Sequence, residues 1–570
     1  MNGAEALVKT LMKQGVKTTW GITGGVIIPL FDAMLAEDGG ITNILTRHEQ
    51  GAAHAAEGYA RALGKPGVCI GTSGPGATNL VTGIMDAYMD SVPMIALGGQ
   101  VATGLIGNDA FQETDMYGIT MPITKHSFAL RNPNEIASTV MKAFRIATEG
   151  RPGPVYIDMP ADVLRKEVTA AAPTEVHIEG FQPTLAPNHR QVMRAGELVL
   201  NAERPLIIAG GGVMASGAFS ELAQLAVMLN IPVATTLQGK GAFDERHPLC
   251  LGAVGMHGRK IANYAQMNAD VIIAIGVRFS DRITGNLASY AENAKVIHID
   301  VDPAEIGKNV KVELPVVGDA KLTLAALNES IVKLAKKGKS SAWNEKVAAF
   351  KKVCDKCIPV PEGKAIHPRQ IIYALNSLLK EDDIVTTGVG QHQMFAMHFL
   401  YRSRPRTFIS SGGSGTMGYG LPAAMGAKVA LPDRRVVCID GDGSFQMNIQ
   451  ELGTLKENDI NVTPVIFNNS YLGMVRQWLE LFYEKRYAQV NLGKSIQFAK
   501  IAEAYGLRGE VVERASELKE KLGSAMNADC TTVVDVRIEE ESNIVPMLPP
   551  GGHLRQMFGT CIKGPDRWFE

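Results

Sequence analysis

Residues 436–469, VVCIDGDGSFQMNIQELGTLKENDINVTPVIFNN, decide how the chain folds. A β-branched run at 436–440 leads into Gly441-Asp442-Gly443, and a helical pattern then extends from Phe445 to about Asn458. A second apolar run ends at Asn468-Asn469. Strand, helix and strand in this order predict one βαβ unit, which brings the carboxyl ends of both strands to the same edge of a parallel sheet.

Polar residues follow both of these strand ends. A carboxylate at Asp442 and an amide oxygen at Asn469 are hard ligands suited to Mg²⁺, which keeps its other positions for water and phosphate oxygens. The flanking glycines let backbone and the helix N-terminus approach a diphosphate closely. Gly-Asp-Gly alone is typical of an ordinary tight turn. With the second strand and its two asparagines, it predicts a Mg²⁺–diphosphate site.

The same alternation of short β-branched runs and helical patterns fills the rest of the chain. Two stretches without a sustained period, 169–190 and 335–364, read as linkers. We therefore predict an α/β fold of three doubly wound parallel-sheet domains at 1–168, 186–335 and 365–545, followed by a C-terminal tail at 546–570. Most of the runs end in Gly, Asn, Asp or Ser, at the sheet edge where open α/β sheets bind ligands.

Composition excludes several classes of function. The 570 residues carry 57 Lys+Arg against 58 Asp+Glu, so there is no basic field for nucleic acid or anionic membrane. No apolar run approaches a membrane span, and the N-terminus opens directly into a helical pattern without a targeting segment. The seven cysteines are odd in number and scattered, and we interpret Cys354-Asp-Lys-Cys357 as two reduced thiols. A cytoplasmic protein is expected.

Several stretches identify the chain as resembling the acetohydroxyacid synthase (acetolactate synthase) catalytic subunits, a family of thiamine-diphosphate enzymes. The resemblance extends over about residues 1–550. The stretches are RHEQGAAHAAEGYAR, TSGPGATN, GQVATGLIGNDAFQE, RPGPVYID, TTLQGKGAFDERHP, GMHG, RFSDRITGN, GVGQHQMFA, GTMGYGLPAA, GDGSFQMNIQEL, NNSYLGMVRQW and LFYEKRY.

The resemblance implies a transferase that decarboxylates pyruvate and joins the hydroxyethyl unit to a second 2-ketoacid. Pyruvate as acceptor gives 2-acetolactate, for valine and leucine synthesis. 2-Ketobutyrate as acceptor gives 2-aceto-2-hydroxybutyrate, for isoleucine. The implied cofactors are thiamine diphosphate, Mg²⁺ and FAD.

The resemblance also assigns residues to the thiamine diphosphate site. Glu49 would protonate the cofactor's aminopyrimidine, and Met447 would prop the cofactor in its bent form. Asp442, Asn469 and the backbone carbonyl of Tyr471 would bind the metal. Further cofactor contacts are implied for Gly390, Gln391, His392, Gly415, Met417, Gly441, Gly443 and Ser444.

A flavin site is implied in the middle domain. Gly210-Gly211-Gly212 and the following residues fit a G-x-G-x-x-A loop after an apolar run, which by itself is a weak dinucleotide signal. The family places FAD here as a structural group that takes no net electrons. The other implied FAD contacts are Arg151, His257, Gly276, Arg278, Asp300 and Asp319.

Residues implied to act on or contact the substrates distinguish this family from related thiamine-diphosphate enzymes. The resemblance gives Gln112 and Lys125 catalytic roles beside Glu49, and gives Phe111, Arg282 and Trp478 substrate contacts. These residues count against a flavin-redox relative such as pyruvate oxidase, and Glu49 counts against glyoxylate carboligase. A non-enzymatic flavin scaffold is a third alternative. The implied assembly is a homodimer or homotetramer with active sites between chains, with or without a small regulatory subunit.

Overall fold

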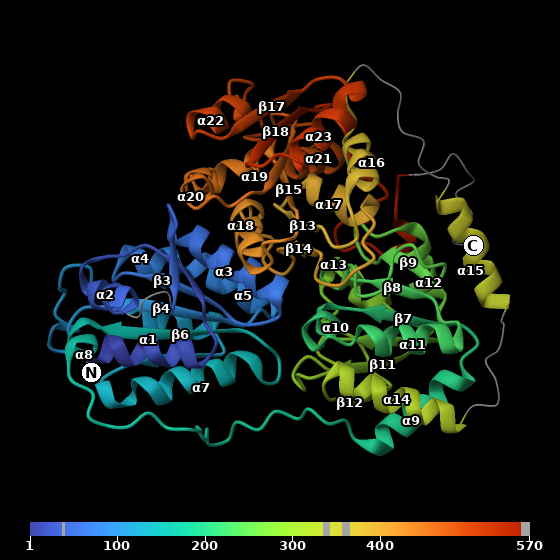
Figure 1. Ribbon diagram of the computed structural model, residues 1–570. Coiled ribbons are helices and arrows are strands. Elements are labelled where there is room, and N and C mark those ends of the chain that lie inside the picture. The colour runs from blue at the N-terminus through green and yellow to red at the C-terminus, as the bar shows by residue number, and fades with distance from the viewer. Residues whose placement is uncertain (37–39, 335–341, 356–364, 560–570) are drawn as a thin grey trace.

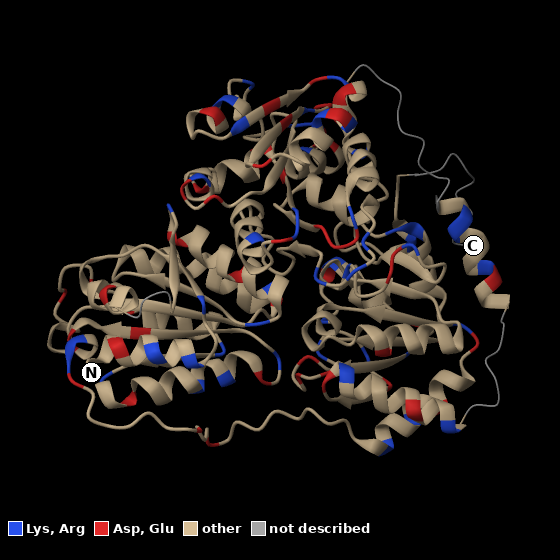
Figure 2. Ribbon diagram, in the orientation of Figure 1, with Lys and Arg blue, Asp and Glu red and all other residues tan. Residues whose placement is uncertain are grey.

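The computed structural model describes residues 1–36, 40–334, 342–355 and 365–559. Three six-stranded sheets, each built of parallel strands flanked by helices, form three domains (Figure 1). Each sheet lies within one of the three predicted domains, and the fold class is confirmed. Acidic and basic residues are interspersed over all three domains (Figure 2), in line with the near-zero net charge.

The N-terminal and C-terminal sheets share one strand order. The N-terminal sheet is ordered β2-β1-β3-β4-β6-β5 and the C-terminal sheet β14-β13-β15-β16-β18-β17, so each reads 2-1-3-4-6-5 in its own numbering. The N-terminal strands are β1 Thr18–Gly21, β2 Thr42–Leu45, β3 Gly67–Gly71, β4 Met94–Gln100, β5 His126–Ala129 and β6 Pro154–Pro160. The C-terminal strands are β13 Ile384–Thr387, β14 Phe408–Ser410, β15 Val436–Gly441, β16 Thr463–Asn468, β17 Arg508–Val512 and β18 Thr532–Arg537.

The middle sheet has a different order, β12-β11-β10-β7-β8-β9, which reads 6-5-4-1-2-3. This is the order of dinucleotide-binding doubly wound sheets, in which the ligand crevice lies between the first and fourth strands. Here those strands are β7 and β10, which pair along their length. The strands are β7 Pro205–Ala209, β8 Val233–Thr235, β9 Cys250–Ala253, β10 Val271–Ile275, β11 Lys295–Asp300 and β12 Leu314–Val317.

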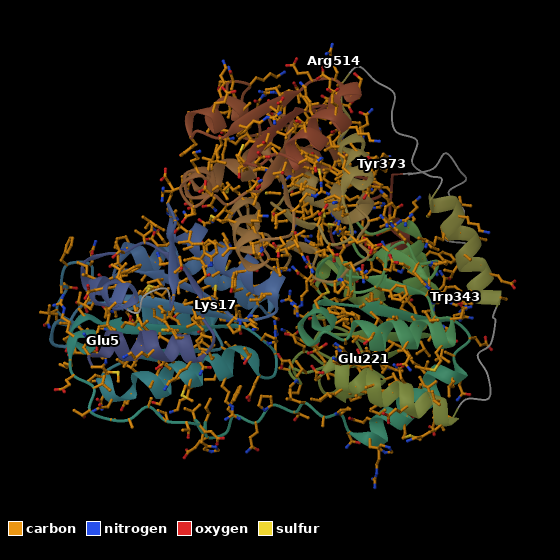
Figure 3. All side chains as sticks on the ribbon, viewed as in Figure 1. Glu5, Lys17, Glu221, Trp343, Tyr373 and Arg514 are labelled. Atoms are coloured by element: carbon orange, nitrogen blue, oxygen red, sulfur yellow. The ribbon has the colours of Figure 1, made fainter. Side chains whose placement is uncertain are left out.

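Helices cover the sheets, and side chains fill the space between them (Figure 3). The N-terminal domain has α1 Gly3–Lys13, α2 Ile28–Ala36, α3 Glu49–Leu63, α4 Pro75–Asn79, α5 Val81–Asp90, α6 Met116–Thr120, α7 Ile136–Thr148 and α8 Ala161–Arg165. The middle domain has α9 His189–Asn201, α10 Gly211–Ser216, α11 Phe219–Leu229, α12 Lys260–Asn268, α13 Asp281–Thr284 and α14 Ala320–Leu334. Within the stretch predicted as a linker, Ala342–Asp355 form α15, whose buried Trp343, Val347 and Phe350 join the core of the middle domain. The C-terminal domain has α16 Pro368–Leu378, α17 Gln391–Phe399, α18 Gly420–Ala430, α19 Asp442–Phe445, α20 Glu451–Glu457, α21 Gly473–Phe482, α22 Phe498–Ala504 and α23 Leu518–Met526. No helix in the described ranges is both long and apolar enough to cross a membrane.

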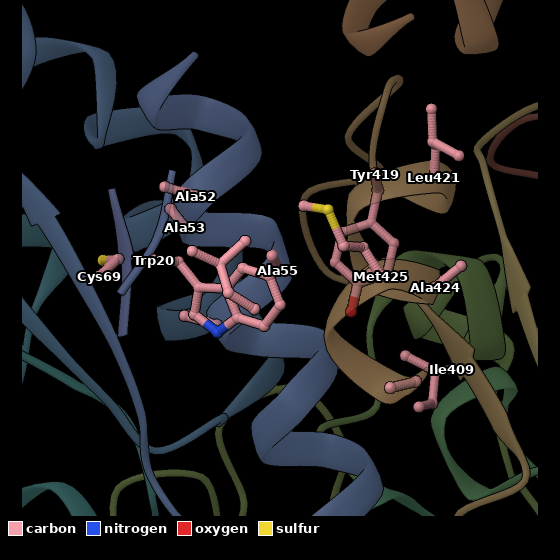
Figure 4. Packing of buried hydrophobic residues seen from close by; sticks show 14 of the residues in the cluster. Trp20, Ala52, Ala53, Ala55, Cys69, Ile409, Tyr419, Leu421, Ala424 and Met425 are labelled. Atoms are coloured by element: carbon pink, nitrogen blue, oxygen red, sulfur yellow. The ribbon is translucent and has the colours of Figure 1, made fainter. Parts of the chain in front are cut away.

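The N- and C-terminal domains share one hydrophobic core, centred on α3 and α18 (Figure 4). The two helices approach closely because small residues face each other. A Cβ at Gly58 would lie 2.3 Å from the carbonyl oxygen of Ala423, and one at Gly426 would lie 1.9 Å from that of Ala55. A larger side chain at either glycine would push the domains apart.

All three domains meet at Asp90, the last residue of α5. Its carboxylate accepts hydrogen bonds from Arg61 (3.1 Å), from the Gln238 side chain of the middle domain (2.7 Å) and from the backbone N–H of Gly412 in the C-terminal domain (2.9 Å). One buried carboxylate therefore fixes the middle and C-terminal domains to the N-terminal domain.

The described part of the tail packs back onto the middle domain. The Leu548 N–H donates to the Met256 carbonyl at 2.8 Å, and Met547 pairs with Phe558 across a short antiparallel bridge. Cys354 is buried, whereas Cys357 lies outside the described residues.

Candidate active site

The sequence-predicted cofactor loops meet in one cavity of the C-terminal domain. It lies at the carboxyl ends of β13, β15 and β16, beside the point where the strand order reverses. Its described lining comes from residues between Pro368 and Ser542, all of this domain. Predicted residues in the lining are Gly390, Gln391, His392, Met417, Gly441, Asp442, Gly443, Ser444, Asn469 and Tyr471.

Asp442 and Asn469 lie at adjacent strand ends, as the spacing predicts. Asp442 is 4% exposed, and its carboxylate accepts hydrogen bonds from the backbone N–H groups of Gly443 (2.8 Å) and Ser470 (2.5 Å). The side-chain oxygen of Asn469 accepts from the Tyr471 N–H at 3.1 Å. Burial raises the pKa of Asp442 to about 7. A cation would reverse this shift because it favours the ionised form, so the donor set fits a divalent metal.

Two loops around the cavity require glycine, Gly441 for lack of space and Gly415 for its backbone conformation. A Cβ at Gly441 would lie 2.6 Å from Nδ1 of His392, and Gly415 has a φ of +66° that favours glycine. The Ser444 hydroxyl accepts from the N–H groups of Val389 (3.4 Å) and Gly418 (3.0 Å). The segments that carry Val389, Gly418 and Ser444 are thus held together around the cavity.

Two side chains suit an organic ligand in this space. Burial lowers the pKa of His392 to about 3, so its imidazole stays neutral and keeps one N–H to donate. Met447 is 51% exposed, and its Cβ lies 2.9 Å from where a Cβ on Gly418 would stand, beside the Gly415–Met417 loop. Met447 and Gly415 are not among the described residues that line the cavity, but a half-exposed methionine beside this loop is available to contact a ligand.

Glu49 lies elsewhere in the same chain. It is the first residue of α3, it is 7% exposed, and its carboxylate accepts from the Asn79 side chain at 3.0 Å. Among the described residues, no N-terminal-domain side chain lines the cavity. The predicted proton donor and the predicted metal site therefore do not form one pocket within a single chain.

The middle domain brings most of the predicted flavin residues to its ligand edge. Gly210 and Gly212 pack directly on Gly276, with a Cβ at Gly210 falling 2.1 Å from the Gly276 carbonyl oxygen. Asp300 ends β11, and burial raises its pKa to about 6. His257 is buried, with a pKa lowered by burial to about 4, and its Nε2 has no hydrogen-bond partner within the described ranges.

Charged residues of two domains meet beside this edge. Arg151 of the N-terminal domain pairs with Asp302 (3.3 Å) and Glu305 (2.9 Å), and Arg278 lies 4.0 Å from the Asp90 carboxylate. The unpaired Nε2 of His257 and the close contact between Gly210 and Gly276 fit a dinucleotide site. Asp319 differs, because its carboxylate accepts from the Leu322 N–H at the start of α14.

The predicted substrate residues divide into two groups. The Arg282 guanidinium lies over the Trp478 ring, 5.8 Å from its centroid, so middle and C-terminal domains meet there. Phe111 is 87% exposed, and Gln112 next to it packs against Gly74 of the β3–α4 turn. Phe111 is thus left without cover in a single chain.

Lys125 is not brought to any of these residues. Its ammonium donates to the backbone carbonyls of Ile146 and Glu149 (2.8 Å for the latter) at the end of α7, and it lies 5.6 Å from the Phe181 ring centroid. These contacts satisfy helix carbonyls that would otherwise lack donors. The predicted catalytic role of Lys125 gains no support from its position.

Some lining residues escaped the sequence analysis. Leu472, Met474 and Val475 lie three to six residues after Asn469, so their place in the chain could have suggested them. Glu539 and Ser542 come from the segment after β18, which carries no recognisable signal.

Comparisons with known proteins agree with this geometry. Family models match at residues 1–119 (thiamine pyrophosphate enzyme, N-terminal TPP binding domain), 192–327 (central domain) and 388–536 (C-terminal TPP binding domain). The chain belongs to the thiamine pyrophosphate enzymes.

Curated relatives narrow the family further. The chain is 51% identical to a probable acetolactate synthase large subunit of Methanocaldococcus jannaschii, over 97% of this chain and 94% of the relative. Identity is 47% to the acetolactate synthase large subunit of Parasynechococcus marenigrum (98% and 91% covered). It is 43% to the isozyme 3 large subunit of Escherichia coli K12 (98% of both). Within the thiamine pyrophosphate enzymes, the chain is a member of the acetolactate synthase large-subunit family.

Proposed function

We propose that the chain is an acetolactate synthase that decarboxylates pyruvate and joins the hydroxyethyl unit to a second pyruvate or to 2-ketobutyrate. The products are 2-acetolactate and 2-aceto-2-hydroxybutyrate. The observation that carries the proposal is the cavity at the ends of β13, β15 and β16, where the buried Asp442 stands among glycine loops suited to a diphosphate. Full-length similarity to acetolactate synthase large subunits supports the choice of reaction.

Thiamine diphosphate and Mg²⁺ are the cofactors that the cavity fits. When bound, thiamine diphosphate supplies an electron sink for the decarboxylation. Asp442, Asn469 and the Tyr471 carbonyl would hold the metal, and the neutral His392 and the Gly441–Ser444 turn would hold the diphosphate. Met447 would orient the pyrimidine ring, and Gly415 and Met417 would lie beside it.

Glu49 would act from a second copy of the chain. Its role is to hold a proton at N1′ of the pyrimidine, but in its own chain it does not line the cavity. A homodimer, or a homotetramer of two such dimers, would place Glu49 of one chain over the cavity of another. Exposed apolar side chains of the N-terminal domain, including Phe111 and Met121 (57% exposed), support a partner surface.

FAD is the cofactor proposed for the middle domain. Its strand order is the dinucleotide-binding one, and Gly210, Gly276, Asp300 and His257 stand at the crevice. Gly211, Arg151 and Arg278 would contact the phosphates or ribose. We propose that FAD stays oxidised during turnover and serves the structure.

The second ketoacid, which accepts the hydroxyethyl unit, would be bound by residues outside the cofactor loops. Arg282 would pair with the carboxylate of the second ketoacid, because a guanidinium fork matches a carboxylate, and the Trp478 face below it would contact the acceptor's alkyl group. Phe111 and Gln112 would complete the pocket from the second chain. Because several relatives are named as large subunits, we also propose a small regulatory subunit as partner.

A single assay tests the function. Purified protein is given pyruvate with thiamine diphosphate, Mg²⁺ and FAD, and with each cofactor omitted in turn, while product and flavin absorbance are followed. We expect acetolactate that requires all three cofactors, with the flavin staying oxidised. Flavin reduction with acetate or acetyl phosphate as product would indicate an oxidase instead, and pyruvate left unconsumed would indicate a non-enzymatic scaffold.

A further inference from the structure

A carboxylate of the C-terminal domain reaches across to the segment that precedes Glu49. Glu451, the first residue of α20, is fully buried. Its Oε1 accepts hydrogen bonds from the backbone N–H groups of Arg47 and His48, both at 3.0 Å. Its Oε2 accepts from the Thr454 hydroxyl at 2.7 Å. One side chain therefore binds two consecutive amides of another domain.

Those two amides belong to the turn that aims Glu49. The turn joins β2, which ends at Leu45, to α3, which begins at Glu49. His48 caps α3, its Nδ1 accepting from the Gln50 N–H at 3.1 Å. With Glu451 holding the preceding N–H groups and the cap holding the first helical turn, the backbone of Glu49 is fixed from both sides.

The Glu451 carboxylate is packed tightly against the first turn of α3. A Cβ at Gly51 would lie 2.5 Å from Oε1 of Glu451, so the first turn of α3 rests directly on the carboxylate. Without Glu451, the N–H groups of Arg47 and His48 would lose the acceptor that they share, and the turn could relax toward the vacated volume.

We propose that Glu451 is a positioning residue for Glu49, holding the Arg47–His48 turn so that the Glu49 carboxylate meets the pyrimidine of thiamine diphosphate. The inference rests on the proposed function, in which Glu49 acts on that cofactor. A displacement of about 1 Å in a catalytic group can cost about 100-fold in rate. Loss of Glu451 should therefore slow the Glu49-dependent step while the cavity itself keeps its ligands.

The test measures exchange of the cofactor C2 proton for deuterium by quenched-flow NMR, at saturating thiamine diphosphate and Mg²⁺. We expect Glu451→Ala to slow exchange about 10–100-fold with nearly unchanged cofactor affinity. Glu451→Gln keeps an oxygen that can accept the amides, so its loss should be below about tenfold. Slower exchange at nearly unchanged cofactor affinity is a readout that general destabilisation would not give.

Glu57→Gln is the matched control. Glu57 is equally buried on α3 and accepts from the Tyr419 hydroxyl of the C-terminal domain at 3.3 Å, but it does not touch the turn. We expect wild-type exchange in this variant. If Glu451→Ala does not fold, the comparison of Glu451→Gln with Glu57→Gln decides, and a few-fold slowing confined to the former is the expected result.

Two outcomes distinguish the positioning role of Glu451 from the proposed role of Glu49. Wild-type exchange in folded, cofactor-saturated Glu451 variants, with Glu49→Gln slowed, overturns the positioning role alone. Wild-type exchange in Glu49→Gln overturns the proposed role of Glu49 itself.

Discussion

Replacing Asp442 by asparagine should make the metal-free protein more stable at pH 8 while it abolishes Mg²⁺-dependent cofactor binding. Burial raises the pKa of Asp442 from 3.8 to about 7. The folded state thus binds this proton more tightly than the unfolded state, and the free energy of unfolding falls as pH rises from about 4 to 7. At 1.36 kcal/mol per pKa unit, ionising the buried carboxyl costs about 4 kcal/mol above pH 7.

Asparagine avoids this cost but introduces another. Its carbonyl oxygen can accept from the Gly443 N–H, but its NH₂ then faces the Ser470 N–H, and an unsatisfied buried donor costs about 1–3 kcal/mol. The net gain at pH 8 is about 1–3 kcal/mol. Between pH 5 and pH 8 the stability difference between variant and wild type should grow by about 3 kcal/mol in favour of asparagine.

Calorimetric unfolding in EDTA at several pH values measures this difference. A second series adds Mg²⁺ and thiamine diphosphate at about 100 times the dissociation constant, which should stabilise the wild type by about 3 kcal/mol and the variant not at all. Asp535→Asn is the control. Asp535 is also buried with a raised pKa, but it accepts from the Asn468 side chain outside the cavity. A pH-independent difference would contradict the raised pKa of Asp442, and equal stabilisation of variant and wild type by the cofactors would contradict its role in binding the metal.

Three further substitutions test the remaining assignments. Trp478→Leu should erode the preference for 2-ketobutyrate by at most about 10–200-fold, the range that one methylene allows, while acetolactate synthesis persists; competition between the two ketoacids measures it. Arg282→Ala should weaken use of both acceptors while pyruvate decarboxylation continues, which CO₂ release compared with product yield will show. Lys125→Met should lower the unfolding temperature, because the end of α7 loses its cation, and leave the C2 exchange rate close to wild type; a large fall in exchange would restore the catalytic role to Lys125.

The sequence predicted that Asp442 and Asn469 lie at adjacent strand ends, because the ends of parallel strands converge on one edge. The spacing of Asp442 and Asn469 was therefore enough to predict that they lie close together. The need for glycine around them followed from steric reasons alone. The binding of a metal by Asp442 and Asn469 stays a prediction. Four strands of each sheet were also evident as apolar runs. Strands such as β5 and β17 escaped because they lie at sheet edges and carry exposed or polar positions.

Contacts between domains could not be predicted in this way. Glu451 binds amides that lie about 400 positions earlier in the chain, and no local pattern encodes that pairing. The contacts of Lys125 could not be predicted either: the resemblance implied a catalytic role, which stays a prediction, and the structure shows its ammonium donating to backbone carbonyls at the end of α7. For Glu49 the resemblance already implied active sites between chains, and the structure adds that Glu49 does not line the described cavity of its own chain.

The absence of Glu49 from its own chain's described cavity has a genetic consequence under the two-chain site that we propose. An allele carrying Glu49→Gln and an allele carrying Asp442→Ala would each be null, yet expressed together they would complement. In a mixed dimer one site would collect both lesions and the other would collect neither. For the same reason, either allele expressed beside the wild type would leave every mixed dimer one intact site, so neither would be fully dominant.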